Sequence, residues 1–174
     1  MDIQIRKLLP NESISYQELR LQCLKNYPKY FTTNYKDEKT KKKLFFQPHI
    51  EKSDTNIFVI GAFNNNNLIG ISGFKRHDRK KINHGGIIIQ VYVNPEYQGK
   101  NIGSNIIKHT LNEAFKLNGI EQIEIGVISI NDNAEKIYKK MGFEEFGLQK
   151  NYLKIDSVYY DHKMMMIFKN QYTR

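Results

Sequence analysis

The sequence is poor in cysteine and tryptophan: its 174 residues include one cysteine and no tryptophan. An internal disulfide needs two cysteines, so the composition excludes the class of small disulfide-rich secreted domains. Cys23 lies in a helix-like segment beside Leu19, Leu21 and Leu24. A reactive thiol needs a basic or electropositive neighbour, and none is apparent, so we expect a buried structural thiol in a cytoplasmic protein.

Long apolar runs are absent as well. The first thirty residues contain only short ones, and the longest later run, Met164–Phe168, falls far below the roughly 20 residues that span a bilayer. We therefore expect neither a secretion signal nor a membrane partner. With 40% hydrophobic content, the chain is long enough to bury one core, and we expect a single domain over residues 1–174.

Arginine is scarce in an otherwise basic chain. The formal net charge is +9, but only five of the 27 basic residues are arginines. Arginine is favoured for recognition of bases and phosphates, because its planar guanidinium donates two parallel hydrogen bonds. No zinc-finger, helix-turn-helix or RNA-binding signature is apparent either. We expect no nucleic-acid partner, although the positive field would help to steer a polyanionic ligand. No metal site is expected either. No cysteine or carboxylate stands at metal-ligand spacing from His49, His77, His109 or His162.

The most informative segment runs from Ile87 to Gly103, where an apolar strand leads through Asn94-Pro95 into a glycine-bearing loop and a helix. Apolar residues at spacings of three and four predict that helix: Ile102, Ile106, Ile107, Leu111, Ala114 and Phe115. Backbone N–H groups at a helix start lack acceptors and carry the positive end of the dipole, so this loop suits phosphate oxygens. The alternative is an ordinary strand-to-helix turn with glycine for local geometry.

Together with a second segment, Ile123–Phe143, this stretch resembles the GNAT acetyltransferase superfamily. The first family signature is matched by Val91-Tyr92-Val93-Asn94-Pro95-Glu96-Tyr97 and then Gln98-Gly99-Lys100-Asn101-Ile102-Gly103. The second is matched at each fixed position by Asn131, Ala134, Ile137, Tyr138, Lys140, Gly142 and Phe143. One departure is Asn101, where the loop usually has its middle glycine. Asparagine tolerates the left-handed backbone better than other non-glycine residues, so we expect the loop to form and coenzyme binding to be at most weakened.

The resemblance implies acetyl-CoA as cosubstrate and assigns residues to it. The pyrophosphate would meet the loop amides of Gln98, Gly99, Lys100, Asn101, Ile102, Gly103 and Ser104. The pantetheine chain would pair with the strand backbone at Val91, Tyr92 and Val93, which in the family splays from its parallel neighbour. Asn131 would hydrogen-bond the coenzyme.

Tyr138 resembles the family tyrosine that protonates the departing thiolate. Periodicity alone also fits a packing aromatic on the stripe of Ala134, Ile137 and Met141. The general base stays open between His84, just before the central strand, and Glu124, on the outward alternation of the following strand. For each, a solvated histidine or a surface glutamate is the alternative.

The order of elements predicts an α/β protein of the α+β type with the GNAT acyl-CoA N-acyltransferase fold. We expect a mixed, mostly antiparallel sheet with a central parallel strand pair and helices on both faces. Expected strands cover 3–8, 56–63, 68–74, 87–93, 123–127, 144–154 and 158–168, and expected helices 11–25, 102–115 and 133–141. The aromatics of the region 27–50 either line an acceptor site or form local core.

The expected activity is transfer of acetyl from acetyl-CoA to a primary amine, preferably of a small molecule, by direct attack in a ternary complex. The +9 charge disfavours polyamines unless Asp37, Glu38, Glu51 and Asp54 form an acidic patch. Two alternatives stay open: an acetyl-CoA-binding regulator or sensor without turnover, and a protein or peptide N-acetyltransferase. The resemblance also leaves a homodimer open.

Overall fold

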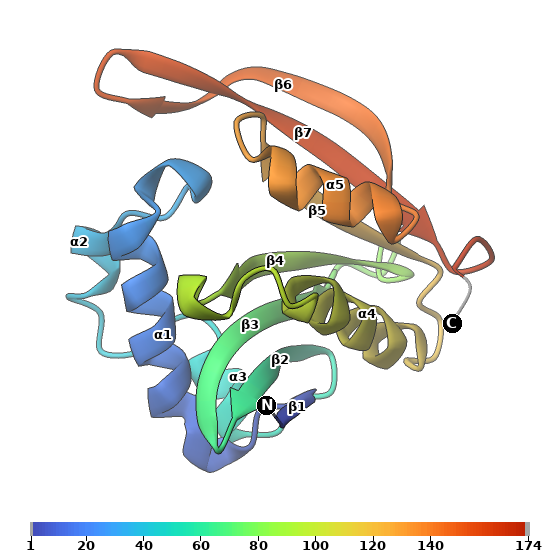
Figure 1. Ribbon diagram of the computed structural model, residues 1–174. Helices are drawn as coiled ribbons and strands as arrows, with labels where there is room; N and C mark the ends of the chain where they lie inside the picture. The colour runs from blue at the N-terminus through green and yellow to red at the C-terminus, as the bar shows by residue number, and fades with distance from the viewer. Residues whose placement is uncertain (1, 173–174) are drawn as a thin grey trace.

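Residues 2–172 are described by the computed structural model, which contains a seven-stranded sheet flanked by helices (Figure 1). The strands are β1 (Ile3–Lys7), β2 (Ile57–Asn64), β3 (Asn67–Arg76), β4 (Gly85–Val93), β5 (Gln122–Ile128), β6 (Glu144–Ile155) and β7 (Val158–Phe168). The helices are α1 (Ser13–Asn26), α2 (Tyr35–Glu38), α3 (Gln47–Glu51), α4 (Ile102–Phe115) and α5 (Asp132–Lys140). Each predicted strand and helix is present.

The sheet has the strand order β1-β2-β3-β4-β5-β7-β6. The β4–β5 pair is parallel because the chain crosses over through α4, and the other neighbouring pairs are antiparallel. The predicted mixed sheet with a central parallel pair is therefore confirmed. The last hairpin places β7 beside β5 and β6 at the edge, and it extends toward the side of α1 and α2 (Figure 1).

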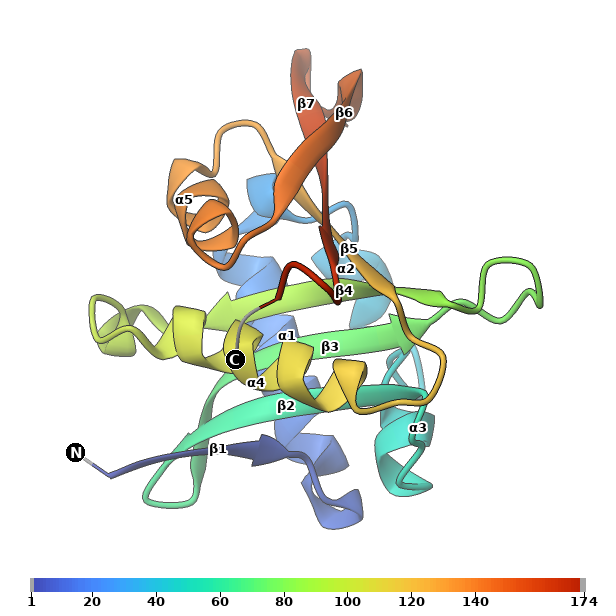
Figure 2. The same cartoon turned by 90° about the vertical axis from the view of Figure 1, so that its right-hand side faces the viewer.

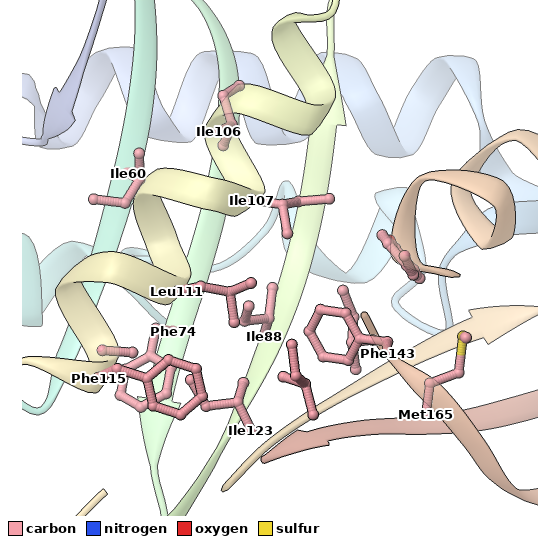
Figure 3. Packing of buried hydrophobic residues seen from close by; sticks show 14 of the residues in the cluster. Ile60, Phe74, Ile88, Ile106, Ile107, Leu111, Phe115, Ile123, Phe143 and Met165 are labelled. Atoms are coloured by element: carbon pink, nitrogen blue, oxygen red, sulfur yellow. The ribbon is translucent and has the colours of Figure 1, made fainter. Parts of the chain in front are cut away.

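Two apolar clusters hold helices against opposite faces of the sheet, with α4 on one side and α1 on the other (Figure 2). Alternation along β2 sends Ile60 to the α4 face and Val59 to the α1 face. The α4 cluster also includes Phe74, Ile88, Ile106, Ile107, Leu111 and Phe115 (Figure 3). The α1 cluster includes Tyr16, Leu19, Cys23, Phe46 and Ile71. These two helices therefore approach the middle of the sheet from opposite sides.

The turn between β2 and β3 confirms the hairpin predicted from the run of asparagines. Asn65 and Asn66 adopt left-handed backbone angles, with φ of 48° and 68°. Two successive residues of this kind match the right-handed twist of the flanking strands, and asparagine tolerates the conformation.

The region 27–50, which the sequence left unassigned, contains a 3₁₀ turn (Pro28–Tyr30), α2 and most of α3. Its aromatics divide between two roles, since Phe46 is fully buried in the α1 cluster whereas Phe45 is exposed. Cys23 is buried as expected, and burial raises the pKa of its thiol to about 12. Within residues 2–172, no helix is both long and apolar enough to cross a membrane.

β4 changes its pairing halfway along, and this change creates room for a site. Its first half pairs with β5 from Gly85 opposite Gln122 to Ile88 opposite Ile125, and the pairing stops there. Further along, its register with β3 shifts near Gln90, whose φ is 60°. Such a bulge bends a strand and re-aims its side chains. The splay between β4 and β5 that the resemblance implied is present.

Candidate active site

A cavity of about 830 Å³ opens where β4 and β5 separate. Its lining includes the loop before α4, most of β4, the end of β5, and α5. Residues from α1, from 27–33 and from the last hairpin complete it. Most of the predicted site residues lie on it: Val91, Tyr92, Val93, Gln98, Gly99, Asn101, Ile102, Gly103, Ser104, Asn131 and Tyr138. Residues of both sequence signatures therefore meet around one space.

The loop between β4 and α4 brings backbone amides to one end of this cavity. Gly99 and Asn101 both adopt left-handed angles, with φ of 76° and 58°. Asn101 is the N-cap residue of α4, and its side chain makes no capping hydrogen bond. The orphan amides of the first turn and the positive end of the helix dipole are thus available to an anion. The loop forms with asparagine in place of the usual glycine.

Gly103 lies in the first turn of α4 at a position where the protein itself does not require glycine. A Cβ built there would lie 3.6 Å from Ile137 Cδ1 and 3.9 Å from Val93 Cγ2, which are ordinary van der Waals distances. The absence of a side chain instead leaves the backbone open toward the cavity. A glycine at such a point suits the close approach of a ligand to the helix start.

α5 contributes two predicted residues of the second signature. Asn131 is its N-cap residue, and the side-chain Oδ1 accepts a hydrogen bond from the Ala134 N–H at 3.2 Å. Tyr138 is 5% exposed, and its ring packs near Phe143 with centroids 6.1 Å apart. Burial raises the pKa of Tyr138 far above its usual value, so the hydroxyl stays protonated at neutral pH. Tyr138 is therefore both a core residue and a residue of the cavity lining.

β7 contributes His162, which the sequence did not place in the site. Its backbone lies opposite Ile128, and its ring stacks on Tyr152 with centroids 4.5 Å apart. A Cβ at Gly126 would lie 2.0 Å from Nε2 of His162, so glycine at that position makes room for the ring. Burial lowers the pKa of His162, which favours the neutral imidazole at neutral pH. No signal in the sequence indicates this placement, because the β5–β7 register that brings His162 to the cavity is a tertiary property.

The far end of the cavity is lined by α1 and by residues 27–33. Arg20 is 2% exposed, and its guanidinium lies 4.6 Å from the centre of the Phe31 ring. Its Nη1 donates to Cys23 Sγ at 3.7 Å. Tyr27 and Tyr30 stack on each other with ring centroids 5.8 Å apart. The aromatic segment that the sequence left open between core and acceptor site thus supplies residues to the lining.

Comparison with known proteins decides the family. The model of the acetyltransferase (GNAT) family matches residues 18–143, well over half of the chain. The chain belongs to the GNAT family. Members of the family use acetyl-CoA, and the match includes both signatures and the loop before α4.

Relatives and solved structures agree with this GNAT assignment. Spermidine N(1)-acetyltransferase of Escherichia coli K12 is 30% identical over 83 residues, which cover 48% of this chain and 45% of that enzyme. The chain therefore spans less than half of that relative. Spermidine N(1)-acetyltransferase of Thermoplasma acidophilum is 26% identical over 165 residues, covering 87% of this chain and 99% of that enzyme.

The fold agrees with the structure of yncA from Salmonella typhimurium, solved with its cofactor acetyl-CoA. The TM-score is 0.81 at 14% identity, over 100% of this chain and 98% of that one. At this level of identity the likeness concerns the fold alone. The predicted GNAT fold is confirmed.

Three predicted residues lie off the lining of this GNAT cavity. Lys100 is exposed, with its Nζ 5.6 Å from the centre of the Tyr97 ring. His84 precedes β4 at the paired end of the strand, and its carbonyl accepts a hydrogen bond from the Glu121 N–H at 2.7 Å. Glu124 lies in the paired half of β5, with Oε1 3.5 Å from Nε2 of His77.

The two sequence candidates for a general base thus lie away from the splay, because the β4–β5 pairing stops only after their positions. Both His84 and Glu124 belong to the closed part of the strand pair. The lining contains a different titratable side chain of the required kind, that of His162. Neither His84 nor Glu124 lies on the cavity lining, and the choice of a general base stays a prediction.

Proposed function

We propose that this protein is an N-acetyltransferase that transfers acetyl from acetyl-CoA to a primary amine of a small molecule. The observation that carries the proposal is one cavity that joins an uncapped helix start, a splayed strand pair and two titratable side chains, Tyr138 and His162. The lone, buried thiol of Cys23 suits the reducing cytoplasm, where we place the protein. We treat residues 1–174 as one catalytic domain.

The chain's own residues fit the parts of acetyl-CoA. When bound, the coenzyme supplies an acetyl group activated as a thioester. The amides from Gln98 to Ser104 would hold its pyrophosphate, because the first turn of α4 has no side-chain cap. The half of β4 that is not paired with β5, with Val91 and Val93, would hydrogen-bond the pantetheine amides in the manner of an added strand. The side-chain amide of Asn131 would contact the coenzyme beside the α5 start.

His162 serves as the general base in this proposal. An alkyl ammonium has a pKa near about 10, so a proton must leave the nitrogen before its lone pair can attack. A neutral imidazole accepts such a proton, and the lowered pKa of His162 keeps it in that form. The nitrogen loses two protons in all. The first passes from the ammonium to His162 and then to solvent, and the second follows the same route as the N–C bond forms and the C–S bond breaks.

Tyr138 serves as the general acid. Its raised pKa keeps the hydroxyl protonated until negative charge develops on the departing sulfur. The proton then moves from the tyrosine oxygen to that sulfur, and the tyrosine is reprotonated from solvent. Backbone N–H groups of β4 beyond Ile88, which have no partner on β5, are the proposed donors to the carbonyl oxygen as it becomes an oxyanion.

The size of the cavity supports a small acceptor. Its volume of about 830 Å³ falls within the range of roughly 300–1,000 Å³ that is typical of small-molecule sites. Part of this space would be taken by the pantetheine arm. The remainder, between α1, residues 27–33 and the last hairpin, suits an acceptor with few heavy atoms better than an extended peptide.

The test measures release of free thiol from acetyl-CoA in the presence of a panel of amines, amino acids and peptides, with mass analysis of the acceptor. We expect amine-dependent release by the wild-type protein. Tyr138→Phe should lower kcat by about 10²-fold, because only the proton donor is removed, and should leave acetyl-CoA affinity unchanged. Binding without release would favour a sensor, release with peptides alone a protein acetyltransferase, and no binding would contradict the proposal.

A further inference from the structure

We infer that the acceptor amine carries a carboxylate and that Arg20 binds this carboxylate at the α1 end of the cavity. The inference rests on the proposed function, because it names the class of acceptor for the same site. It predicts an amino-acid-like substrate. It also separates this protein from its spermidine-acetylating relatives, whose acceptor is a polycation.

Arg20 is a buried cation without a counterion. It is 2% exposed, and none of the ion pairs among the described residues includes it. Its Nε is buried without a hydrogen-bond partner, and Nη1 has only the weak acceptor Cys23 Sγ, at 3.7 Å. A buried guanidinium normally pairs with a carboxylate or phosphate, because desolvation of an unpaired charge is costly. The missing partner is explained if the ligand supplies it.

The side chains around Arg20 on the lining are suited to hold a small organic anion rather than a hydrated ion. Phe31 covers the guanidinium, and Tyr27 and Tyr30 continue the aromatic wall. The hydroxyl of Tyr92 is buried and has no partner within hydrogen-bonding distance. Burial raises the pKa of Tyr92 to about 12, and the nearby Asn26 side chain opposes that rise. An aromatic wall around a fixed fork matches a planar carboxylate next to an apolar side chain.

Carboxylates of the protein do not compensate Arg20. Among the described residues no aspartate or glutamate lies on the cavity lining. Glu38 and Arg20 both lie near Tyr16, since the charges of both residues affect the pKa of Tyr16. Glu38 nevertheless forms its ion pair with Lys41. Of the other residues considered for an acidic patch, Glu51 pairs with Lys43, and Asp54 with His49 at 2.9 Å. The cavity thus has positive charge and no negative charge, which opposes a polyamine and favours an anion-bearing amine.

The coenzyme phosphates are not the proposed partner of Arg20. The pyrophosphate site proposed above lies at the start of α4, and α4 and α1 pack on opposite faces of the sheet (Figure 2). The cavity passes between them through the gap where β4 and β5 separate. Arg20 therefore approaches the reacting centre from the side opposite to the phosphates, where the acceptor would enter.

The first experiment needs no variant. In the presence of acetyl-CoA, kcat/KM is measured by thiol release for each of the common L-amino acids, for the carboxamide of each, and for spermidine. We expect the best acid to exceed its own carboxamide by about 10-fold or more, because the amide leaves the buried charge unpaired. Spermidine should be a poorer acceptor than that acid. Equal rates for acid and amide, or a preference for spermidine, would overturn the inference.

The second experiment compares Arg20→Gln with Arg79→Gln, an exposed arginine outside the lining. Arg20→Gln should raise KM for the preferred acid about 10- to 100-fold, while KM for its carboxamide changes by less than about 3-fold. Arg79→Gln should change neither. A purely structural Arg20 would instead lower both activities in parallel, which would contradict a binding role. If Arg20→Gln does not fold, Arg20→Lys, which keeps the charge but loses the fork, should retain only part of the acid preference.

The two proposals fail in distinguishable ways. Thiol release with amines but without any preference for a carboxylate would overturn the role of Arg20 alone and leave the acetyltransferase in place. Failure of every amine to release thiol, in a protein that keeps its melting temperature, would overturn both.

Discussion

The two ends of the cavity are built differently. The coenzyme end comes from one continuous stretch, residues 85–143, in which β4, the loop, α4, β5 and α5 follow in order. The acceptor end collects Arg20 from α1, three aromatics from residues 27–31, and His162 from β7. The first end therefore depends on local backbone geometry, and the second on how distant elements pack. Substitutions in the loop and first turn of α4 should change coenzyme affinity, and substitutions at the acceptor end should change turnover and the choice of acceptor.

The largest effect should follow removal of the base at the hairpin side. We expect His162→Gln to lower kcat by about 10²-fold or more, because a positioned base typically contributes 10²–10⁴. Acetyl-CoA affinity should change little, since His162 lies outside the phosphate loop. A variant that loses coenzyme affinity and turnover together would break the division between the two ends.

The same residue predicts a pH profile. Burial lowers the pKa of His162 below 6.5, and the active form is the neutral one. As pH falls through this lowered pKa the imidazole becomes protonated, so kcat should be constant near neutrality and fall on the acid side below pH 6.5. The acid limb should be missing in the residual activity of His162→Gln. If the kcat of His162→Gln still falls on the acid side, that fall must come from the titration of another group.

Gly126→Ala should disturb the same imidazole without removing it. The added Cβ would lie 2.0 Å from Nε2, so the ring must move. A displacement of this order typically costs about 10- to 100-fold in turnover, and we expect kcat to fall in that range. The comparison is kcat of Gly103→Ala at saturating acetyl-CoA, because the new Cβ there meets ordinary contacts and the expected defect is in coenzyme affinity. Unchanged kcat in Gly126→Ala would argue against His162 as the base.

Gly103→Ala should show the reverse pattern. Because the protein has room for a Cβ there, we expect thermal stability to be kept or slightly raised, since alanine favours a helix by about 0.5–1 kcal/mol over glycine. Acetyl-CoA affinity should fall about 10-fold, because the methyl group occupies the space that phosphate oxygens would approach. Calorimetry and thermal melting measure the two quantities on one sample. Full affinity in a stable variant would show that phosphate does not bind at this helix start.

Asn101→Gly should have the smallest effect. The asparagine already adopts φ of 58°, so the conformation that glycine would favour is present without it. We expect the coenzyme dissociation constant to change by less than about 3-fold, which corresponds to under about 0.7 kcal/mol. A much larger gain in affinity would mean that the departure from the family pattern does weaken binding.

The residues proposed for the coenzyme end could be named from the sequence because their signals are local. Spacing in the two signatures, the glycines of the loop and the apolar run of β4 all act within short stretches, so the central parallel strand pair and the residues proposed to bind the coenzyme followed from them. The acceptor end was predicted poorly. Arg20 stands between Leu19 and Leu21 and has the appearance of an ordinary charged helix residue. His162 enters the cavity only through the β5–β7 register.

The position of Glu124 also depends on tertiary structure that the sequence does not reveal. Its outward alternation was read correctly, but whether it reaches the site depends on where the β4–β5 pairing stops. That boundary falls after Ile88 and Ile125, next to the bulge near Gln90. A bulge has no reliable signal in one sequence, because its extra residue can be any of several types.

The most direct test of the proposed two-ended site is a calorimetric titration of acetyl-CoA into the wild-type protein, followed in the same sample by thiol release on addition of the amino-acid panel. We predict one acetyl-CoA bound per chain and release that depends on the amine. Absence of binding in a folded protein would contradict the coenzyme end, and with it the function proposed here.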